Sequence, residues 1–462
     1  MTTGRGRVSW ALFDWANQPF FTVVTTFIFA PYFAAEVVGD PVAGQALWGT
    51  IQGVAGLVIA VAAPVLGAMA DATGPKKPWI LAFQLLTVAG CVALWWAFPG
   101  RPESVVLVVV AMIVATIGAE FSIVFNNALL PSLVRAEAVG RLSGLGWAMG
   151  YAGGLVALAL VLAAGRPQLF GLGSADGGPL FGLDAATFAV ERATGPVSAL
   201  WLIVFVLPMV LFTPDHAATG RRGMAALGQG LRQIGETLRR LSRYRNLALY
   251  LAAFMIYNNG LAAVIAFGGI YAKGIFGWST TALGLFGILL TVFATLGALV
   301  GGRLDDRLGS RRTIALAILG VAAASLGLLS ITADAILFVV PVAPMAPGGG
   351  LFATPQERAF LAFALVLGVC MGPMQAASRT MVARLAPADM VAEFYGLFAL
   401  SGKATAFVAP FAVALATAYF ASQRAALVVV LVFLVAGYAL LRRVREERAP
   451  GLAPIPHAPK MR

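Results

Sequence analysis

The chain has 462 residues, of which 60% are hydrophobic and only 11% are charged, whereas a soluble domain has about 25% charged residues. This composition excludes an ordinary soluble protein and indicates a membrane protein. The formal net charge of +12 does not indicate nucleic-acid binding, because the Lys and Arg residues fall at the ends of apolar runs and not on a soluble domain.

Twelve apolar segments can cross a bilayer as helices, which takes about 20 mostly apolar residues each. They are 10–36, 46–70, 79–98, 105–131, 143–164, 197–213, 247–272, 281–302, 313–332, 359–378, 394–420 and 425–441. We therefore expect an all-α membrane protein with twelve transmembrane helices. The apolar stretch 332–358 is interrupted by prolines and is either a loop or an extension of the ninth helix.

The loops after the second and eighth segments repeat one another. Gly67, Asp71, Gly74, Lys76 and Lys77 match Gly302, Asp306, Gly309, Arg311 and Arg312, each pair 235 positions apart. A pair of glycines lets a helical hairpin turn tightly, and a basic cluster keeps that turn in the cytoplasm. The agreement at five positions predicts two six-helix pseudo-repeats.

This repeated turn resembles the loop signature of the major facilitator superfamily. The resemblance implies the major facilitator fold, in which these turns contact the facing half and help to set the balance between inward and outward states. They are therefore predicted to be gating loops and not the substrate site.

The distribution of basic residues predicts that both termini are cytoplasmic. With that orientation, 25 of the 32 Lys and Arg residues fall in cytoplasmic segments, as the positive-inside rule requires. The predicted units are an N-terminal half (1–213), a cytoplasmic linker (214–246), a C-terminal half (247–441) and a cytoplasmic tail (442–462). In the linker, leucine and isoleucine recur at helical spacing between arginines, which predicts a helix on an anionic membrane surface.

Polar side chains within the segments are the best indicators of a transport site, because an ionisable group near the centre of a bilayer costs about 2.5 to 3.5 kcal/mol. They gather in the first, fourth, seventh and tenth segments, and the eleventh segment adds Lys403. The candidates for substrate binding or coupling are Asp14, Asn17, Gln18, Glu120, Asn127, Asn258, Asn259, Gln375, Arg379 and Lys403. An alternative role for single amides and hydroxyls is hydrogen bonding between helices.

Glu120 is the acidic residue deepest within a segment, and Lys403 is the lysine in the corresponding position of the eleventh segment. We hypothesise that they face one cavity from opposite halves, where they form a gate pair or bind a zwitterion. Glu120 is also a candidate for proton coupling, because burial raises the pKa of a carboxyl group.

Three stretches carry a narrower resemblance. SWALFDWANQPFFTVVTTFIFAPYF, FNNALLPSL with RLSGLGWAMGYAGG, and MQAASRTMVARLAPADMVAEFYGLFALSGKATAFVAP are similar to the vacuolar amino-acid effluxer family of fungi and its bacterial relatives. The resemblance implies that Asp14, Trp15, Asn17, Asn127, Arg379, Arg384, Glu393 and Lys403 are family positions. Relatives often have Asn-Asp-Gly in the seventh helix, where this chain has Asn258, Asn259 and Gly260, so a coupling role at that position does not carry over.

The sequence therefore predicts a secondary or facilitative transporter of a small polar solute, working by alternating access. The resemblance favours amino acids as substrates and the bacterial plasma membrane as the location. The alternatives are a non-coupled exporter of drugs or other metabolites, an intramembrane enzyme and a sensor. The expected partners are a small-molecule substrate, the lipid bilayer and protons, with a monomer as the expected state and no enzyme activity, nucleic acid, cofactor or metal expected.

Overall fold

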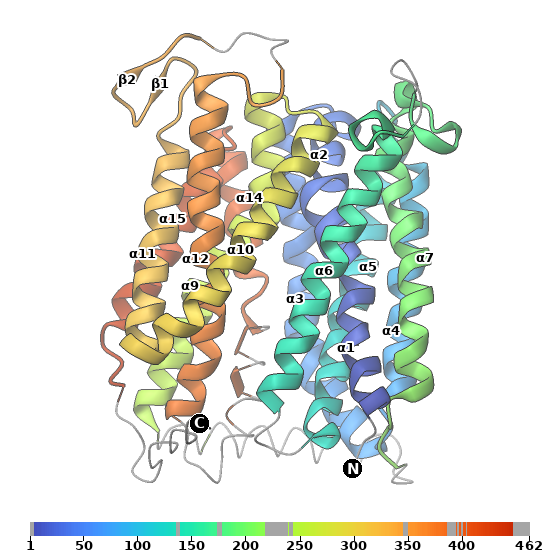
Figure 1. The fold of residues 1–462 in the computed structure, drawn as a ribbon, viewed down its shortest axis with the longest axis vertical. Helices are drawn as coiled ribbons and strands as arrows, with labels where there is room; N and C mark the ends of the chain where they lie inside the picture. Colours follow the sequence, from blue (N-terminus) through green and yellow to red (C-terminus); the bar gives the residue numbers. More distant parts are fainter. Residues whose placement is uncertain are drawn as a thin grey trace, which may run out of the picture.

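The computed structural model describes residues 4–134, 139–172, 178–217, 239, 244–344, 350–385, 394, 397–398, 401–402 and 404–446. Its long helices form two halves that stand side by side, one blue to green and the other yellow to red (Figure 1). In the described ranges, ten helices are long and apolar enough to cross a membrane, and Val408–Phe420 and Ala425–Leu441 are shorter apolar helices. The predicted fold class of twelve apolar segments is confirmed.

The N-terminal half contains six crossings. The first is continuous over Gly4–Val37 and consists of α1 (Gly4–Pro19), π-helical turns η1 (Phe20–Phe27), α2 (Phe29–Tyr32) and η2 (Phe33–Val37). The others are α3 (Pro41–Thr73), α4 (Lys77–Ala93) with η3 (Leu94–Trp96), α5 (Pro102–Leu133), α6 (Val139–Gly165) and α7 (Ala189–Phe212). Short 3₁₀ turns η5 (Pro167–Phe170), η6 (Leu180–Gly182) and η7 (Ala185–Thr187) join α6 to α7.

The C-terminal half has the same plan. Its helices are α9 (Arg245–Phe276), α10 (Thr280–Leu308), α11 (Ser310–Leu329), α12 (Pro355–Leu385), α14 (Val408–Phe420) and α15 (Ala425–Leu441). Strands β1 (Ala335–Ile336) and β2 (Val340–Pro341) form an antiparallel hairpin between α11 and α12. The described residues 332–344 and 350–354 are therefore a loop and not an extension of α11, while residues 355–358 already belong to α12.

Local capping explains where several helices begin. The Asp40 side chain accepts hydrogen bonds from the amides of Val42 and Ala43 at the start of α3, and Pro41 occupies the first helical position. Thr354 and Glu357 exchange hydrogen bonds at the start of α12, which is a capping box. These ends satisfy the backbone amides that a helix leaves unpaired.

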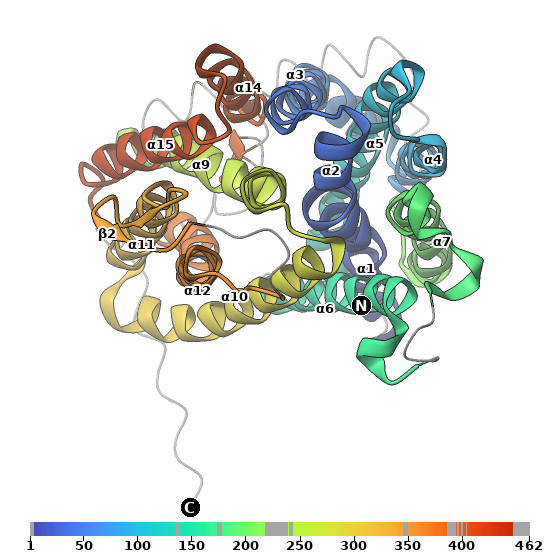
Figure 2. The ribbon, with the colours of Figure 1, turned by 90° about the horizontal axis from the view of Figure 1, so that it is seen from above.

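The two halves meet along two helix pairs. Figure 2 shows α3 beside α14 on one side of the molecule and α6 beside α10 on the other. On the first seam, α3 presents small residues, so that a β-carbon at Gly49 would lie 2.7 Å from the carbonyl oxygen of Pro410. Close backbone approach of this kind is typical of helix packing in membranes.

The eleventh crossing differs from the predicted continuous helix over 394–420. Described residues 394, 397–398, 401–402 and 404 are helical, but Thr405 to Phe407 form a turn before α14 begins at Val408. Pro410 explains the break, because it has no amide to donate to Ala406 and its ring clashes with that carbonyl group. The predicted amphipathic linker helix and most of the tail lie outside the described residues, so the predicted domain boundaries stay predictions.

Because the number of crossings is even, the start of α1 and the end of α15 lie at the same end of the bundle, here called the terminal end. The two repeated motif loops also lie there. The opposite end, which carries β1 and β2 (Figure 1), is here called the hairpin end.

Candidate functional site

A polar stripe on α1 lies directly against a glycine stripe on α6. Asp14 and Gln18 on α1 and Thr22 on η1 are spaced four residues apart, and Gln18 Nε2 donates to Thr22 Oγ1 at 3.2 Å. A β-carbon at Gly146 would lie 2.4 Å from Asp14 Oδ2, and one at Gly154 would lie 2.5 Å from Thr22 Oγ1. The glycines on α6 therefore leave space for the α1 side chains, which a larger residue would fill.

Arg379 brings a positive charge from the other half to this stripe. Its guanidinium group lies over the ring of Trp147 on α6, 4.9 Å from the ring centroid, which is within the range of a cation–π interaction. It also lies within electrostatic range of Asp14 and Tyr151. The described structure thus brings two of the predicted residues, Asp14 and Arg379, together across the boundary between the halves. Trp147 is not among the residues predicted from the sequence.

Asn17 lies on another face of α1, inside the N-terminal half. Its Oδ1 atom accepts a hydrogen bond from Gln84 Nε2 on α4 at 3.0 Å, and the same nitrogen lies 3.0 Å from Ser122 Oγ on α5. All three side chains are buried. The described contacts of Asn17 join three helices, which is the hydrogen-bonding role that single amides can have within a bundle.

Asn259 is engaged at the break in the eleventh crossing. Its Nδ2 atom donates to Met255 O and to Thr405 Oγ1, and its Oδ1 atom accepts from the amide of Ala409. These contacts stabilise backbone that the turn before α14 leaves outside a helix. The neighbouring Asn258 is half-buried, and a β-carbon at Gly402 would lie 4.0 Å from its Nδ2 atom.

In the tenth crossing, the polar residues divide between two environments. Ser378 is buried, where its Oγ atom lies 2.7 Å from Tyr257 Oη and its carbonyl oxygen accepts from Tyr250 Oη at 2.5 Å. Gln375 and Arg379, one turn apart on α12, are half-buried. Ser378 therefore ties α12 to α9 within the C-terminal half, while Arg379 reaches the other half.

The remaining predicted residues of the fourth and eleventh crossings are not brought together by the described structure. On α5, Glu120 is half-buried and Asn127 is exposed. Lys403 and Glu393 lie outside the described residues. The hypothesis that Glu120 and Lys403 face one cavity therefore stays a prediction.

At the hairpin end, polar contacts join the two halves. Lys273 Nζ on α9 forms a salt bridge with Glu36 Oε1 on η2 at 2.9 Å, and Thr280 Oγ1 on α10 donates to Glu191 on α7. Gln45 Nε2 on α3 donates to Thr417 Oγ1 on α14 at 2.9 Å. The sequence did not indicate this set of contacts, because none of its residues lies in a motif.

The motif loop of the N-terminal half is bound by a carboxylate from the end of α7. The backbone amides of Lys76 and Lys77, at the start of α4, donate to Asp215 Oδ1 and Oδ2 at 2.8 and 2.9 Å. Lys77 Nζ donates to Val210 O at 2.8 Å. A carboxylate at a helix N-terminus is stabilised by the free amides and by the helix dipole.

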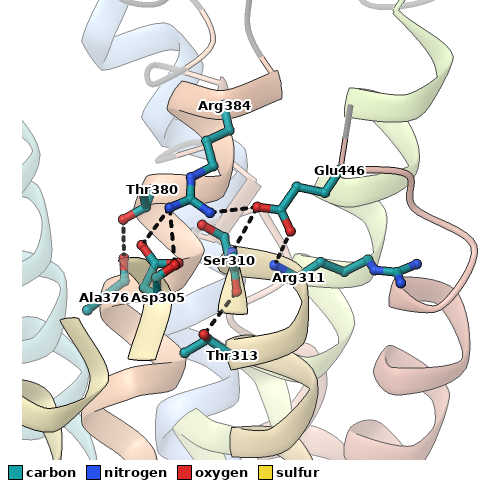
Figure 3. Close-up of polar contacts among 9 residues, drawn as sticks. Asp305, Ser310, Arg311, Thr313, Ala376, Thr380, Arg384 and Glu446 are labelled. Atoms are coloured by element: carbon teal, nitrogen blue, oxygen red, sulfur yellow. Dashed lines mark hydrogen bonds and ion pairs between the residues drawn. The ribbon is translucent and has the colours of Figure 1, made fainter. Parts of the chain in front are cut away.

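The motif loop of the C-terminal half is bound by Glu446, beyond the end of α15. Its carboxylate accepts from the backbone amides of Ser310 and Arg311 at 2.8 and 3.0 Å. Figure 3 shows Arg384 between this carboxylate and Asp305. Arg384 Nη1 lies 2.6 Å from Glu446 Oε1, and its Nη2 lies 3.4 Å from Asp305 Oδ2.

The charge environment of Glu446 keeps it ionised. Burial alone would raise its pKa, but the hydrogen bonds from Arg384 and from the amides of Arg311 and Ser310, together with the charge of Arg384, lower the pKa below its ordinary value. The cluster is therefore a charge-assisted cap on α11.

Only the second glycine of each predicted pair lies in the turn itself. Gly74 and Gly309 have φ values of 98° and 87°, which only glycine adopts readily, whereas Gly67 lies within α3 and Gly302 within α10. Arg312 is exposed on α11. The side chains of Asp71 and Asp306 lie outside the described residues, so their gating role stays a prediction.

Comparison with known families gives one match that covers most of the chain. The family described as "Vacuole effluxer Atg22 like" matches residues 35–451. The MFS-type transporter YxiO of Bacillus subtilis is 23% identical over 446 residues, which cover 95% of this chain and 94% of that protein.

Fungal relatives and solved structures agree with this match. Autophagy-related protein 22 of Cryptococcus neoformans is 26% identical over 313 residues, covering 67% of this chain and 51% of that protein, so the match spans about half of the fungal protein. A crystal structure of a D-xylose-proton symporter has a TM-score of 0.67 at 14% identity and covers 95% of this chain and 97% of that one. At this identity the likeness establishes the fold alone.

Proposed function

Because the chain belongs to the Vacuole effluxer Atg22 like family and is a membrane transporter of the major facilitator type, we propose that it moves a small polar solute by alternating access. Amino acids are the substrate class that the sequence resemblance favours. We place it in the plasma membrane of a bacterium, with the terminal end in the cytoplasm. This orientation follows from the distribution of Lys and Arg.

The observation that carries the proposal is that Asp14 of one half lies within electrostatic range of Arg379 of the other. A carboxylate from one half and a guanidinium group from the other can bind the ammonium and carboxylate groups of one zwitterion. Trp147 orients the guanidinium group, and Gln18 adds an amide one helical turn from Asp14. A solute bound by both halves is released when they separate, which links binding to the alternating movement.

The contacts between the halves at the hairpin end support a cycle of this kind. The salt bridge between Glu36 and Lys273 and the hydrogen bond between Gln45 and Thr417 hold the hairpin end together. These contacts must break when that end opens. We therefore propose that the described state is closed on the outside and that solute exchanges with the cytoplasm.

Counterflow in proteoliposomes tests the proposed substrate class. Vesicles that contain the purified protein are loaded with unlabelled solute from a panel of amino acids, sugars and drugs. Uptake of labelled solute is then measured with and without a pH gradient. We expect exchange of amino acids that Arg379→Gln and Asp14→Asn each reduce about tenfold or more, because a hydrogen bond to a charged group contributes about 1.5 to 3 kcal/mol. Stimulation by a pH gradient would assign proton coupling.

A matched control removes a carboxylate from elsewhere in the same protein. Glu103 is exposed in the first turn of α5, so Glu103→Gln should leave exchange unchanged. Exchange of sugars or drugs but of no amino acid would overturn the substrate class and leave the transporter assignment intact. Full activity of both Asp14→Asn and Arg379→Gln would overturn the site.

A further inference from the structure

The hairpin between α11 and α12 exposes an apolar tip. Leu337, Phe338, Val339 and Val340 are 51%, 56%, 80% and 47% exposed. Between Arg312 and Glu357 the only charged residue in the sequence is Asp334. A loop surrounded by water usually carries polar and turn-forming residues, so four adjacent exposed apolar side chains indicate a surface that is covered by something else.

The backbone at the tip is strained at two of these apolar residues. Leu337 and Phe338 have φ values of 54° and 64°, in the left-handed region that glycine and asparagine adopt more easily. A bulky residue there costs about 1 to 2 kcal/mol. Glycine would relieve this strain but would remove the apolar side chain. Apolar residues stand at these positions despite the strain, which indicates that their side chains have a role.

The hairpin is held firmly at its base. Gln356, at the start of α12, donates through Nε2 to the carbonyl oxygens of Ala333 and Ala343, at 2.8 and 2.7 Å, on either side of the two strands. The tip itself is tied to α11, because the amide of Phe338 donates to Ser330 O at 3.2 Å. The tip therefore lies at the height of the end of α11 and does not extend away from it.

The length of α11 places its end, and with it the tip of the hairpin, at the edge of the hydrocarbon core. The helix has 20 residues, which span about 30 Å at 1.5 Å per residue, the thickness of the hydrocarbon core. Leu316, Leu319 and Leu326 are about half-exposed along the helix, as lipid-facing residues are. The end of α11 consequently lies at the boundary between hydrocarbon and headgroups, and Figure 2 shows the hairpin over α11 at the outer edge of the bundle.

We propose that residues 337–340 form an interfacial anchor that inserts into the headgroup region of the bilayer at the hairpin end. The occupant of the apolar surface is phospholipid, continuous with the lipid that contacts the exposed leucines of α11. Apolar side chains at this depth gain the free energy of transfer from water without crossing the membrane. The anchor would fix the position of α11 and α12 relative to the membrane surface, whichever solute the protein carries.

Spin-label accessibility tests the depth of the tip. Cys91 and Cys370 are replaced by alanine, and single cysteines are introduced by Val339→Cys, Leu319→Cys and Ala217→Cys in protein reconstituted into phosphatidylcholine and phosphatidylglycerol vesicles. Leu319 is the lipid reference and Ala217, exposed beyond the end of α7, is the water reference. Collision of each label is measured with oxygen, which concentrates in lipid, and with a nickel chelate, which stays in water.

The ratio of oxygen to nickel collisions at Val339 should be several-fold higher than at Ala217 and approach the ratio at Leu319. A ratio at Val339 equal to that at Ala217 would place the tip in water and overturn the anchor. Low collision with both reagents would mean that protein covers the tip, which also overturns it. The measurement would then be repeated at a higher lipid-to-protein ratio. Dilution in lipid would uncover a tip that is covered by a second copy of the chain, but not one that is covered by a segment of the same chain.

Discussion

The two motif loops at the terminal end occupy matching positions in their halves but have different connections. In the N-terminal half, Asp215 binds the amides at the start of α4. In the C-terminal half, Glu446 binds the amides at the start of α11 and also pairs with Arg384, which reaches Asp305 at the end of α10. The C-terminal loop is therefore joined to three other elements of its half by charged groups.

This difference indicates unequal stiffness in the two halves. The Arg384 cluster ties the ends of α10, α12 and α15 to the start of α11, so these elements must move together unless the ion pairs break. In the N-terminal loop, Asp215 and Val210 bind the start of α4 to the end of α7, and Trp79 Nε1 on α4 donates to Thr73 Oγ1 on α3. We expect the C-terminal loop to move as a rigid unit, and the N-terminal loop to deform first, when the two halves move relative to one another.

The largest expected effect follows from Glu446→Gln. It removes the charge that accepts two backbone amides and leaves Arg384 half-buried without its nearest partner, which should cost about 2 to 3 kcal/mol locally. Hydrogen exchange should show protection of the Ser310 and Arg311 amides falling about 30-fold or more, since each 1.4 kcal/mol is a factor of ten. Glu447→Gln removes an equal charge one position later and is the control.

A second substitution acts on the same cap through the backbone. Gly309 has φ 87° and ψ 158°, a region that is essentially restricted to glycine, where another residue costs about 1 to 3 kcal/mol. A β-carbon there would also lie 2.8 Å from Glu446 Oε2. Gly309→Ala should lower the melting temperature of the protein and expose the Ser310 amide. If Gly309→Ala melts like the wild type, the turn does not need glycine.

Asp215→Asn should have a smaller effect than Glu446→Gln. An asparagine side chain can still accept from one amide at a helix N-terminus, so the expected cost is about 0.5 to 1 kcal/mol. Protection of the Lys76 and Lys77 amides should fall about threefold, with the C-terminal loop unchanged. An effect equal to that of Glu446→Gln would show that the two loops are equally stiff.

The loops could be predicted from the sequence, but the carboxylates that bind them could not. The loops are recognised because their glycines and basic residues repeat at a constant spacing of 235, whereas Asp215 and Glu446 are 231 positions apart and differ in residue type. The shorter side chain of Asp and the longer side chain of Glu can both bind a helix N-terminus. The contact is therefore present in both halves although the residue type and the spacing differ. Pro75, which has no amide to donate, also moves the bonded amides by one position in the N-terminal loop.

The same reasoning explains the rest of the predictions. Apolar length alone predicted the crossings, because the bilayer requires it. Helical periodicity placed Asp14 and Gln18 on one face, but it also placed Asn17 close to that face. Only the hydrogen bond from Gln84 shows that the Asn17 amide points into the interior of the N-terminal half. Cross-half partners such as Trp147 and Lys273 could not be predicted, because packing between halves leaves no local pattern.

The smallest expected effect is that of pH on the C-terminal loop. The pKa of Glu446 is lowered in the folded protein, so its contribution to stability is fully present above the ordinary pKa of a glutamate, about 4.3, and is lost as the pH falls through the lowered value. Protection factors of the Ser310 and Arg311 amides should therefore stay constant from about pH 7 to pH 5 and fall only in stronger acid. Glu446→Gln should abolish the acid-dependent part, because it has no proton to gain there. A wild-type loop that opens between pH 7 and pH 5 would mean that another group controls it, and the stiffness attributed to the Arg384 cluster would have to come from that group.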